Sequence, residues 1–301
     1  MGPTASGKTG IAMQLADAFP LELVSVDSAL VYRGMDIGTA KPGAASLRRY
    51  PHRLIDLRDP EESYSAGDFV RDVGIEIKSI HDAGRIPLLV GGTMMYFRSL
   101  IDGIATLPAA DQAIRSAINA EAASVGWPEL HRQLTEIDSV AAARINPNVA
   151  QRIQRALEVY RLSGRCLSDW QVDQSTSQNT FEFIKFALIP EPRSVLHERI
   201  AERLEQMLDA GFIDEMRVLM NRPGLTAEHG SMRAVGYRQY WAHLSGEYDA
   251  EEARSKALAA TRQLAKRQLT WLRSEADITA INPLETDAYA TISTVLAGQI
   301  N

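Results

Sequence analysis

The chain has 301 residues, of which 45% are hydrophobic and 23% are charged, a composition typical of a soluble globular protein with a full-sized core. No apolar run approaches the roughly 20 residues that a membrane span needs, and no secretory signal opens the chain. The single cysteine, Cys166, excludes an internal disulfide framework and a multi-cysteine zinc site, so we expect a cytoplasmic protein with no membrane association.

The charge is unevenly distributed. A formal net charge of −6 argues by itself against a general nucleic-acid binder. Residues 144–165 nevertheless hold five arginines and one acid, and residues 262–273 hold four basic residues and no acid. Each segment carries +4, which leaves −14 for the remainder. Two basic stripes on an acidic body indicate either a footprint for a polyanion or ordinary solvated helix faces, and the sequence leaves both readings open.

The first 105 residues alternate between helical and strand-like patterns. Helices are predicted over residues 7–18 and 66–83. Short apolar runs predict strands over residues 23–26, 54–57 and 87–90. Short strands separated by helices are typical of a parallel sheet with helices on both faces.

The pattern changes near Leu107-Pro108, after which the chain is helical, Ala-rich and Arg-rich. Helices are predicted over residues 110–124, 127–137, 139–145 and 148–163. Gly164 stands where a C-terminal cap is expected, and the polar stretch 173–180 is predicted to be a loop.

Strand character returns at residues 181–189. Further helices are predicted over residues 193–210, 231–244 and 250–274, and a last strand over 278–281. The α/β pattern therefore resumes after a helical interruption. We assign residues 1–108 and 181–301 to a catalytic core and residues 109–180 to an all-helical insertion domain.

A phosphate-binding loop opens the chain. Gly2–Thr9 fits G-x-x-x-x-G-K-[ST] at every fixed position. Backbone N–H groups of such a loop converge on phosphate oxygens, Lys8 adds a point charge, and the Thr9 hydroxyl can hold Mg²⁺. A chance glycine turn is the alternative. The motif makes the core a P-loop domain.

The loop departs from its usual setting in one respect. A buried strand normally precedes it, whereas only Met1 precedes Gly2 here. Either the true start lies upstream or the central strand is missing, which would leave an open slot in the sheet. We favour a mis-assigned start, with Met1 as the last residue of that strand.

Polar residues follow two of the predicted strands. Asp27 comes directly after residues 23–26, where a carboxylate can ligate Mg²⁺ or act as a general base; the alternative is a cap for the next segment. Residues 87–90 are followed by two glycines and Thr93, which can donate to a phosphate or form only a tight turn. The absence of an acid after that strand argues against ATP hydrolysis. Residues 32–42, with two glycines and two positive charges, are predicted to be a functional loop.

Eight segments together resemble the tRNA dimethylallyltransferase (isopentenyl-tRNA transferase) family, and the bacterial enzymes in particular. They are GPTASGKT at 2–9, DSALVYRGMDIGTAKP at 27–42, PHRLID at 51–56, SAGDF at 65–69, GRIPLLVGGTMMYF at 84–97, QRIQRALEVY at 151–160, RAVGYRQ at 233–239 and AKRQLTWLR at 265–273. They span nearly the whole chain in the order that the family shows.

The resemblance implies a P-loop fold that binds an allylic diphosphate with Mg²⁺ as the metal. The donor would be dimethylallyl diphosphate, and the acceptor the exocyclic N6 amine of the adenosine just 3′ of the anticodon. By position, Asp27 would be the base and Thr93 would contact the reacting centre. The diphosphate would be held by Thr4, Ala5, Ser6, Gly7, Lys8 and Thr9, with Thr9 also on the metal.

The resemblance also implies a surface for the tRNA anticodon arm. Its expected residues are Asp27, Ser28, Ala29, Leu30, Thr93, Arg115, Gln151, Arg152, Ile153, Gln154, Arg155, Arg233 and Lys266. Many members carry glutamine where this chain has Leu30, which removes one polar side chain from that surface. Arg199 and Arg203 lie one helical turn apart, and Arg203 is predicted to reach the diphosphate; surface ion pairs are the alternative.

Two other functions compete with this one. A small-molecule kinase would use the same loop to bind ATP, with the helical insertion as a lid. A non-catalytic RNA-binding protein would leave Asp27 and Thr93 without a purpose. We therefore predict a monomeric prenyltransferase that needs no obligate protein partner.

Overall fold

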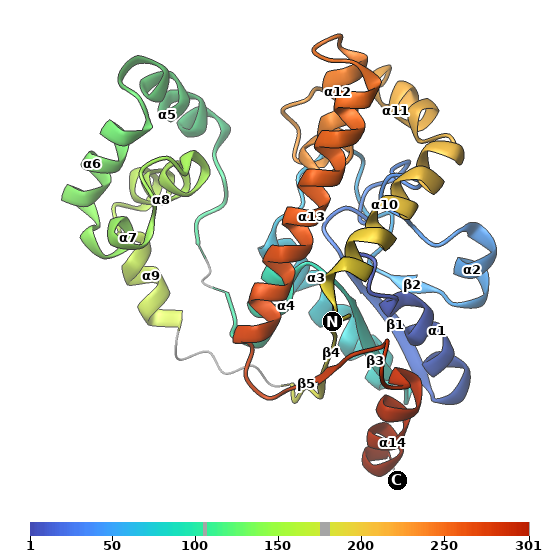
Figure 1. Cartoon of the computed structure of the whole chain (residues 1–301). Coiled ribbons are helices and arrows are strands. Elements are labelled where there is room, and N and C mark those ends of the chain that lie inside the picture. Colours follow the sequence, from blue (N-terminus) through green and yellow to red (C-terminus); the bar gives the residue numbers. More distant parts are fainter. Residues whose placement is uncertain (105–106, 175–180, 301) are drawn as a thin grey trace. The chain divides into compact units, whose positions relative to one another are not determined.

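The computed structural model describes residues 1–104, 107–174 and 181–300 (Figure 1). The chain divides into two compact units. The core unit comprises Met1–Ser99 and Glu182–Asn301, and the helical unit comprises Leu100–Phe181. No helix among the described residues combines the length and the apolar character that crossing a bilayer requires.

A parallel sheet organises the core unit. Strand β1 (Leu21–Val26) lies between β2 (His52–Arg53) and β3 (Ile86–Gly91), and both neighbours run parallel to it. The register pairs Leu21 with Ile86 and Val26 with Gly91, so β1 and β3 end together. Because parallel strands present their carboxyl ends at one edge, the residues after β1 and β3 are brought side by side.

Helices α1 (Lys8–Ala18) and α3 (Ala66–Asp82) both pack against β1 and β3. The sequence of α3 explains why it forms where it does. Ser65 and Asp68 form a capping box at its start. Phe69, Val73, Ile77 and Ile80 make one buried stripe, as their spacing predicts.

The remaining strands form a second sheet, in which β4 (Lys185–Leu188) pairs in parallel with β5 (Ile278–Ile281). Met1 lies beside β4: its amino group donates to the Phe186 carbonyl at 2.7 Å, and the Leu188 amide donates to the Met1 carbonyl at 3.0 Å. The residue before the phosphate loop is thus paired with a strand.

Among the described residues, seven further helices belong to the core unit, and α4 runs across its boundary. They are α2 (Ala44–Arg49), α4 (Met94–Ile101), α10 (Arg193–Asp209), α11 (Phe212–Met220), α12 (Tyr237–Leu244), α13 (Ala250–Ser274) and α14 (Ala288–Ile300). A cluster of buried side chains joins α10, α11, α12 and α13, and includes Met35, Phe212, Met216, Tyr237 and Tyr240. The long helix α13 runs through this group (Figure 1).

The helical unit has a core of its own. Its described helices are α5 (Gln112–Val125), α6 (Trp127–Ile137), α7 (Ser139–Arg144), α8 (Ala150–Ser163) and α9 (Leu167–Gln174). Ile118, Leu130, Leu134, Ile153 and Leu157 are all buried in it. Gly164 ends α8 in the left-handed conformation, with φ 69°, as a helix cap requires.

Several predicted elements were wrong in extent. The strand predicted over 54–57 is instead His52–Arg53, because Leu54 and Asp56 have φ values of 63° and 56°, which no strand accommodates. The strand predicted over 181–189 is limited to β4.

The helix predicted over 231–244 is interrupted. A 3-10 turn covers Ser231–Arg233, and α12 begins only at Tyr237, because Gly236 has φ 91°. Of the loop predicted over 173–180, residues 173 and 174 belong to α9, and 175–180 lie outside the described residues. The helices α2, α4, α9, α11 and α14 were not predicted.

Candidate active site

The phosphate loop forms a nest of backbone amides. Ala5 and Gly7 both adopt left-handed conformations, with φ 62° and 87°, and α1 begins directly after Gly7. Residues that alternate in hand in this way turn successive N–H groups toward one side, where the positive end of the helix adds its field. The geometry is suited to an anion. Gly7 is needed in it because φ 87° is strained for a residue that carries a side chain.

Lys8 lies inside this loop. Its Nζ donates to the Pro3 carbonyl at 3.2 Å. Burial lowers the pKa of Lys8 to about 8; the charge of Asp27 opposes this shift and the charge of Arg203 adds to it. Asp27 and Arg203 therefore both lie within electrostatic range of the loop lysine.

Arg203 belongs to α10 and is half-buried. Burial lowers its pKa. Among the described residues, neither Arg203 nor Arg199, one turn earlier, forms an ion pair with a carboxylate. A half-buried guanidinium beside an amide nest, without an acidic partner there, is available to a ligand anion.

Asp27 and Thr93 meet at the carboxyl ends of β1 and β3. Thr93 Oγ1 accepts a hydrogen bond from the Ser28 amide at 3.0 Å, and the Thr93 amide donates to the Val26 carbonyl at 3.2 Å. A side chain at Gly91 would place its Cβ 1.9 Å from the Val26 carbonyl oxygen. The glycine is therefore what lets the two strand ends approach this closely.

The two oxygens of the Asp27 carboxylate have different surroundings. Oδ1 accepts hydrogen bonds from the amides of Ala29 at 2.9 Å and Leu30 at 3.4 Å, so it caps the following turn. Within the described part of the chain, Oδ2 has no hydrogen-bond partner. One oxygen fixes the side chain and the other is left for chemistry.

Gln268 is a site residue that the sequence reading missed. It lies on α13, where its Oε1 accepts from the Thr4 amide at 2.9 Å and its Nε2 donates to the Gly92 carbonyl at 2.7 Å. One signal in the sequence points to it: Gln268 is a polar residue on the stripe that buries Ala265, Leu269 and Leu272.

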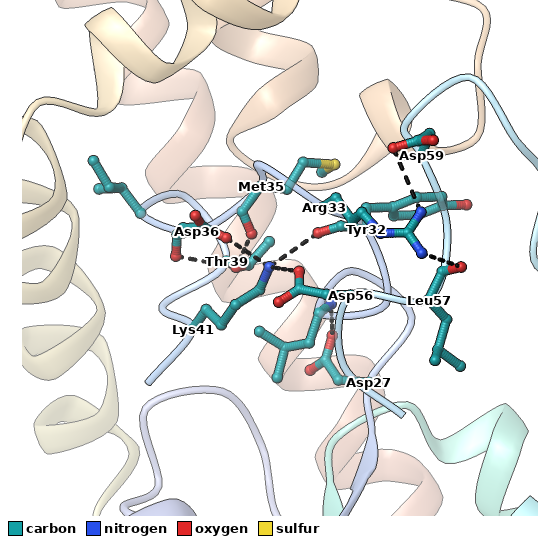
Figure 2. Close-up of polar contacts among 12 residues, drawn as sticks. Asp27, Tyr32, Arg33, Met35, Asp36, Thr39, Lys41, Asp56, Leu57 and Asp59 are labelled. Atoms are coloured by element: carbon teal, nitrogen blue, oxygen red, sulfur yellow. Dashed lines mark hydrogen bonds and ion pairs between the residues drawn. The ribbon is translucent and has the colours of Figure 1, made fainter. Parts of the chain in front are cut away.

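The loop after Asp27 is held by a buried lysine (Figure 2). Lys41 Nζ donates to the Tyr32 carbonyl at 2.9 Å, to Asp36 Oδ1 at 2.6 Å and to Asp56 Oδ1 at 2.5 Å, and its side chain is 4% exposed. Arg33 donates to the Leu57 carbonyl at 3.2 Å. The two positive charges that marked this loop as functional therefore serve to anchor it.

A carboxylate of α11 also accepts hydrogen bonds from the backbone of residues 36–38 in this loop. Glu215 accepts hydrogen bonds from the amides of Asp36 at 2.9 Å, Ile37 at 2.6 Å and Gly38 at 3.1 Å. It also accepts from the Tyr237 hydroxyl at 2.5 Å. Burial and this neighbouring carboxylate together raise the pKa of Tyr237. The loop that begins at the predicted base is thus rigidly supported.

The predicted tRNA-contacting residues of the core unit lie in different places. Asp27, Ser28, Ala29, Leu30 and Thr93 gather at the strand ends. Two others are separate from this group and exposed: Arg233 is the last residue of the 3-10 turn and pairs with Glu228 at 2.7 Å, and Lys266 projects from α13.

In the helical unit, two of the arginines predicted to bind tRNA donate hydrogen bonds to a buried carboxylate. Glu158 is fully buried and accepts from Arg115 Nε at 2.9 Å and from Arg155 at 2.7 Å. Burial alone would raise the pKa of Glu158, but these hydrogen bonds outweigh it and hold that pKa below its usual value. Arg115 and Arg155 therefore support the fold, whatever else they bind.

The other predicted residues of α8 divide by exposure. Gln151 and Arg152 are exposed, and Gln154 donates to Asn119 at 2.7 Å. Ile153 was predicted among the RNA contacts, but its side chain is fully buried in the core of the unit. The helix turns this apolar side chain inward because every third or fourth residue faces the same way.

No group of three or more histidine, cysteine or acidic residues that could enclose a metal ion occurs among the described residues. Mg²⁺ characteristically binds through one or two protein oxygens, substrate phosphates and water. The Thr9 hydroxyl and the Asp27 carboxylate are oxygen ligands of that kind, so the residues present fit such an ion.

Comparison with known proteins places these features in a family. Residues 30–275 match the family model for IPP transferase. The full-length tRNA isopentenylpyrophosphate transferase from Bacillus halodurans is 38% identical, with 99% of this chain and 94% of that chain covered and a TM-score of 0.71. The tRNA delta(2)-isopentenylpyrophosphate transferase from Staphylococcus epidermidis is 31% identical, with 100% and 97% covered and a TM-score of 0.70.

A eukaryotic dimethylallyltransferase acting on tRNA shares the fold, with a TM-score of 0.78. Its identity is 24%, over 98% of this chain and 76% of that chain. These similarities confirm the predicted α/β fold with a P-loop core and a parallel sheet.

Proposed function

The chain belongs to the IPP transferase family, the tRNA isopentenyltransferases, and on this premise we propose that it transfers a dimethylallyl group from dimethylallyl diphosphate to tRNA. The acceptor is the N6 amine of the adenosine 3′-adjacent to the anticodon. One observation carries the assignment: the end of β1, with Asp27, and the end of β3, with Thr93, meet beside the amide nest that holds Lys8.

The reaction needs both halves of this arrangement. An aromatic amine is a weak nucleophile because its lone pair is delocalised into the ring. As N6 bonds to C1 of the allyl group, the bond from C1 to the diphosphate oxygen breaks and N6 loses a proton. Asp27 Oδ2 accepts that proton, and Oδ1 keeps its hydrogen bonds to the backbone.

The leaving diphosphate is stabilised by the loop. Its developing charge meets the amides of residues 5 and 7–9, the Lys8 ammonium and the Arg203 guanidinium. Thr93, fixed through Ser28, orients the reacting centre. Mg²⁺, held by the Thr9 hydroxyl, would neutralise further negative charge on the diphosphate.

A target base in a single-stranded loop leaves its stack at little cost, which suits the anticodon arm as acceptor. The exposed side chains Arg152, Arg233 and Lys266 are available for its phosphates. Because the acceptor is tRNA, the proposal includes action in the cytoplasm. It requires no second protein chain, since the donor-site residues all come from the core unit.

A direct test combines labelled dimethylallyl diphosphate, Mg²⁺ and unmodified tRNA, and measures label in RNA. We predict that Asp27→Asn lowers kcat by about 10²–10⁴-fold, the usual value of a general base, and leaves tRNA affinity unchanged. The amide oxygen of the variant can still accept from Ala29, so the turn is preserved.

The control is Asp209→Asn, at an exposed acid at the end of α10, which should transfer at the wild-type rate. Loss of tRNA affinity in parallel with activity would contradict the assignment of Asp27 as the base. Absence of label from RNA with the wild-type protein would contradict the function itself, and label transfer from ATP to a small molecule would favour the kinase alternative.

A further inference from the structure

We propose that Gln268 is a positioning residue of the transfer reaction, which holds the phosphate loop and the Gly92-Thr93 turn at a fixed separation. The proposal rests on the proposed function, because it concerns how the leaving group and the accepting base are aligned. Gln268 is remote in sequence from the phosphate loop: it lies 264 residues after Thr4.

The two hydrogen bonds of Gln268 connect the two halves of the site. Oε1 accepts from the amide of Thr4 at 2.9 Å, and Nε2 donates to the carbonyl of Gly92 at 2.7 Å. The residue is 7% exposed. A buried amide is tolerated only when its polar atoms are paired, so these contacts fix the side chain in one orientation.

Close packing supports the same arrangement. Ala5 of the phosphate loop packs with Ala265 and Leu269, the residues of α13 on either side of Gln268 along its buried face. A Cβ at Gly92 would lie 2.5 Å from Gln268 Nε2. The glycine therefore leaves the space that the glutamine amide occupies, and the two positions are matched to each other.

From Gln268 the connection reaches the base in short steps. Gly92 precedes Thr93, whose Oγ1 accepts from the Ser28 amide, and Ser28 follows Asp27. The Thr4 amide donates to Gln268 Oε1 and the Ser6 amide donates to the Pro3 carbonyl at 3.3 Å, which leaves the amides of residues 5 and 7–9 for the diphosphate. Helix α13 thus sets the distance between the site of departing charge and the site of proton transfer.

Two variants and one control test this inference in the labelled-transfer assay. In Gln268→Ala both hydrogen bonds are lost, and we expect kcat to fall by about 10²-fold, the effect of misplacing reacting groups by roughly 1 Å, while KM for tRNA is unchanged. Gln263→Ala, at an exposed glutamine on the same helix, should keep the wild-type kcat.

Gln268→Glu separates positioning from packing by its pH profile. The variant has the shape of glutamine but, when ionised, cannot donate to the Gly92 carbonyl; when protonated, it can donate to Gly92 and still accept from Thr4. Its activity relative to wild type should therefore rise as the pH falls, and burial places this transition above the usual range of a carboxyl.

The inference is overturned if folded Gln268→Ala transfers at the wild-type rate, or if the relative activity of Gln268→Glu does not change with pH. Should Gln268→Ala fail to fold, the pH profile of Gln268→Glu decides alone. Wild-type protein in the same assay shows whether transfer occurs at all, so a failure of the proposed function is recognised separately.

Discussion

At the scale of single residues, some polar groups of the candidate active site hold the backbone, and others are those proposed to meet the substrates. Asp27 commits Oδ1 to two amides. Lys8 donates to the Pro3 carbonyl, and burial lowers its pKa to about 8. An ammonium with a depressed pKa binds an anion strongly only while it keeps its proton, so the loop should be sensitive to mildly alkaline pH.

We predict that the affinity for dimethylallyl diphosphate falls as the pH rises through about 8, where Lys8 of the free protein loses its proton. The terminal phosphate of the ligand ionises near pH 6, so the ligand charge stays constant in this range. Calorimetric titration from neutral pH to about pH 10, the ordinary pKa range of lysine, measures the effect. Lys8→Met should bind more weakly and without this pH step; an identical step in Lys8→Met would assign it to another group.

At the scale of elements, two arginines of α8 that were both predicted to bind tRNA have different surroundings. Arg152 is exposed and has no ion pair among the residues that the structure describes. Arg155, one turn later, donates to Glu158 at 2.7 Å and to the Pro108 carbonyl at 2.8 Å. The spacing of Arg152 and Arg155 along the helix does not reveal this difference. It depends on the buried Glu158, which accepts hydrogen bonds both from Arg155 and from Arg115 of α5.

We predict that Arg155→Ala lowers the free energy of unfolding of the helical unit by about 1.5–3 kcal/mol, the value of a hydrogen bond to a charged group. Urea denaturation measures it. The change should also weaken tRNA binding, since the surface of α8 is disturbed. A variant as stable as wild type would mean that Arg115 alone suffices for Glu158.

The matched variant is Arg152→Ala. We expect unchanged stability, weaker tRNA binding, and a slope of log affinity against log salt that is smaller by about 0.7–0.9, the contribution of one phosphate contact. Titration at several salt concentrations measures the slope. If the slope matches that of the wild type, Arg152 does not contact a phosphate.

At the scale of the whole molecule, the chain contains two separately packed units. The residues proposed for the donor belong to the core unit, and the exposed residues of α8 belong to the helical unit. An overall charge of −6 coexists with local basic segments, so tRNA binding depends on where the positive charges lie and not on the net charge.

We predict that dimethylallyl diphosphate with Mg²⁺ stabilises the core unit against heat more than ATP with Mg²⁺ does. A ligand at 100 times its Kd contributes about 2.7 kcal/mol, which for a unit of this size raises Tm by roughly 5–10 °C. Thermal denaturation in the presence of each ligand makes the comparison. A larger shift with ATP would favour the kinase alternative.

Much of the fold could be predicted from local signals. Two helices, Trp127–Ile137 and Ala250–Ser274, and the strand Ile278–Ile281 were predicted with their exact bounds. This was possible because periodicity and helix caps depend on residues that are close in sequence. The short helix at Ala44–Arg49 was missed, since it buries no side chain and has no apolar stripe. The strand predicted over 54–57 is absent from those residues because Leu54 and Asp56 adopt left-handed backbone conformations.

The sequence by itself determined the phosphate loop, the strand-end residues Asp27 and Thr93, and the family to which their spacing points. Only the tertiary structure decided the hydrogen-bond partners of buried side chains: Gln268 with the Thr4 amide, Glu158 with Arg115, and Lys41 with Asp56. The physical reason is that a motif is local, whereas the partner of a buried polar group is whatever residue the fold brings within about 3 Å.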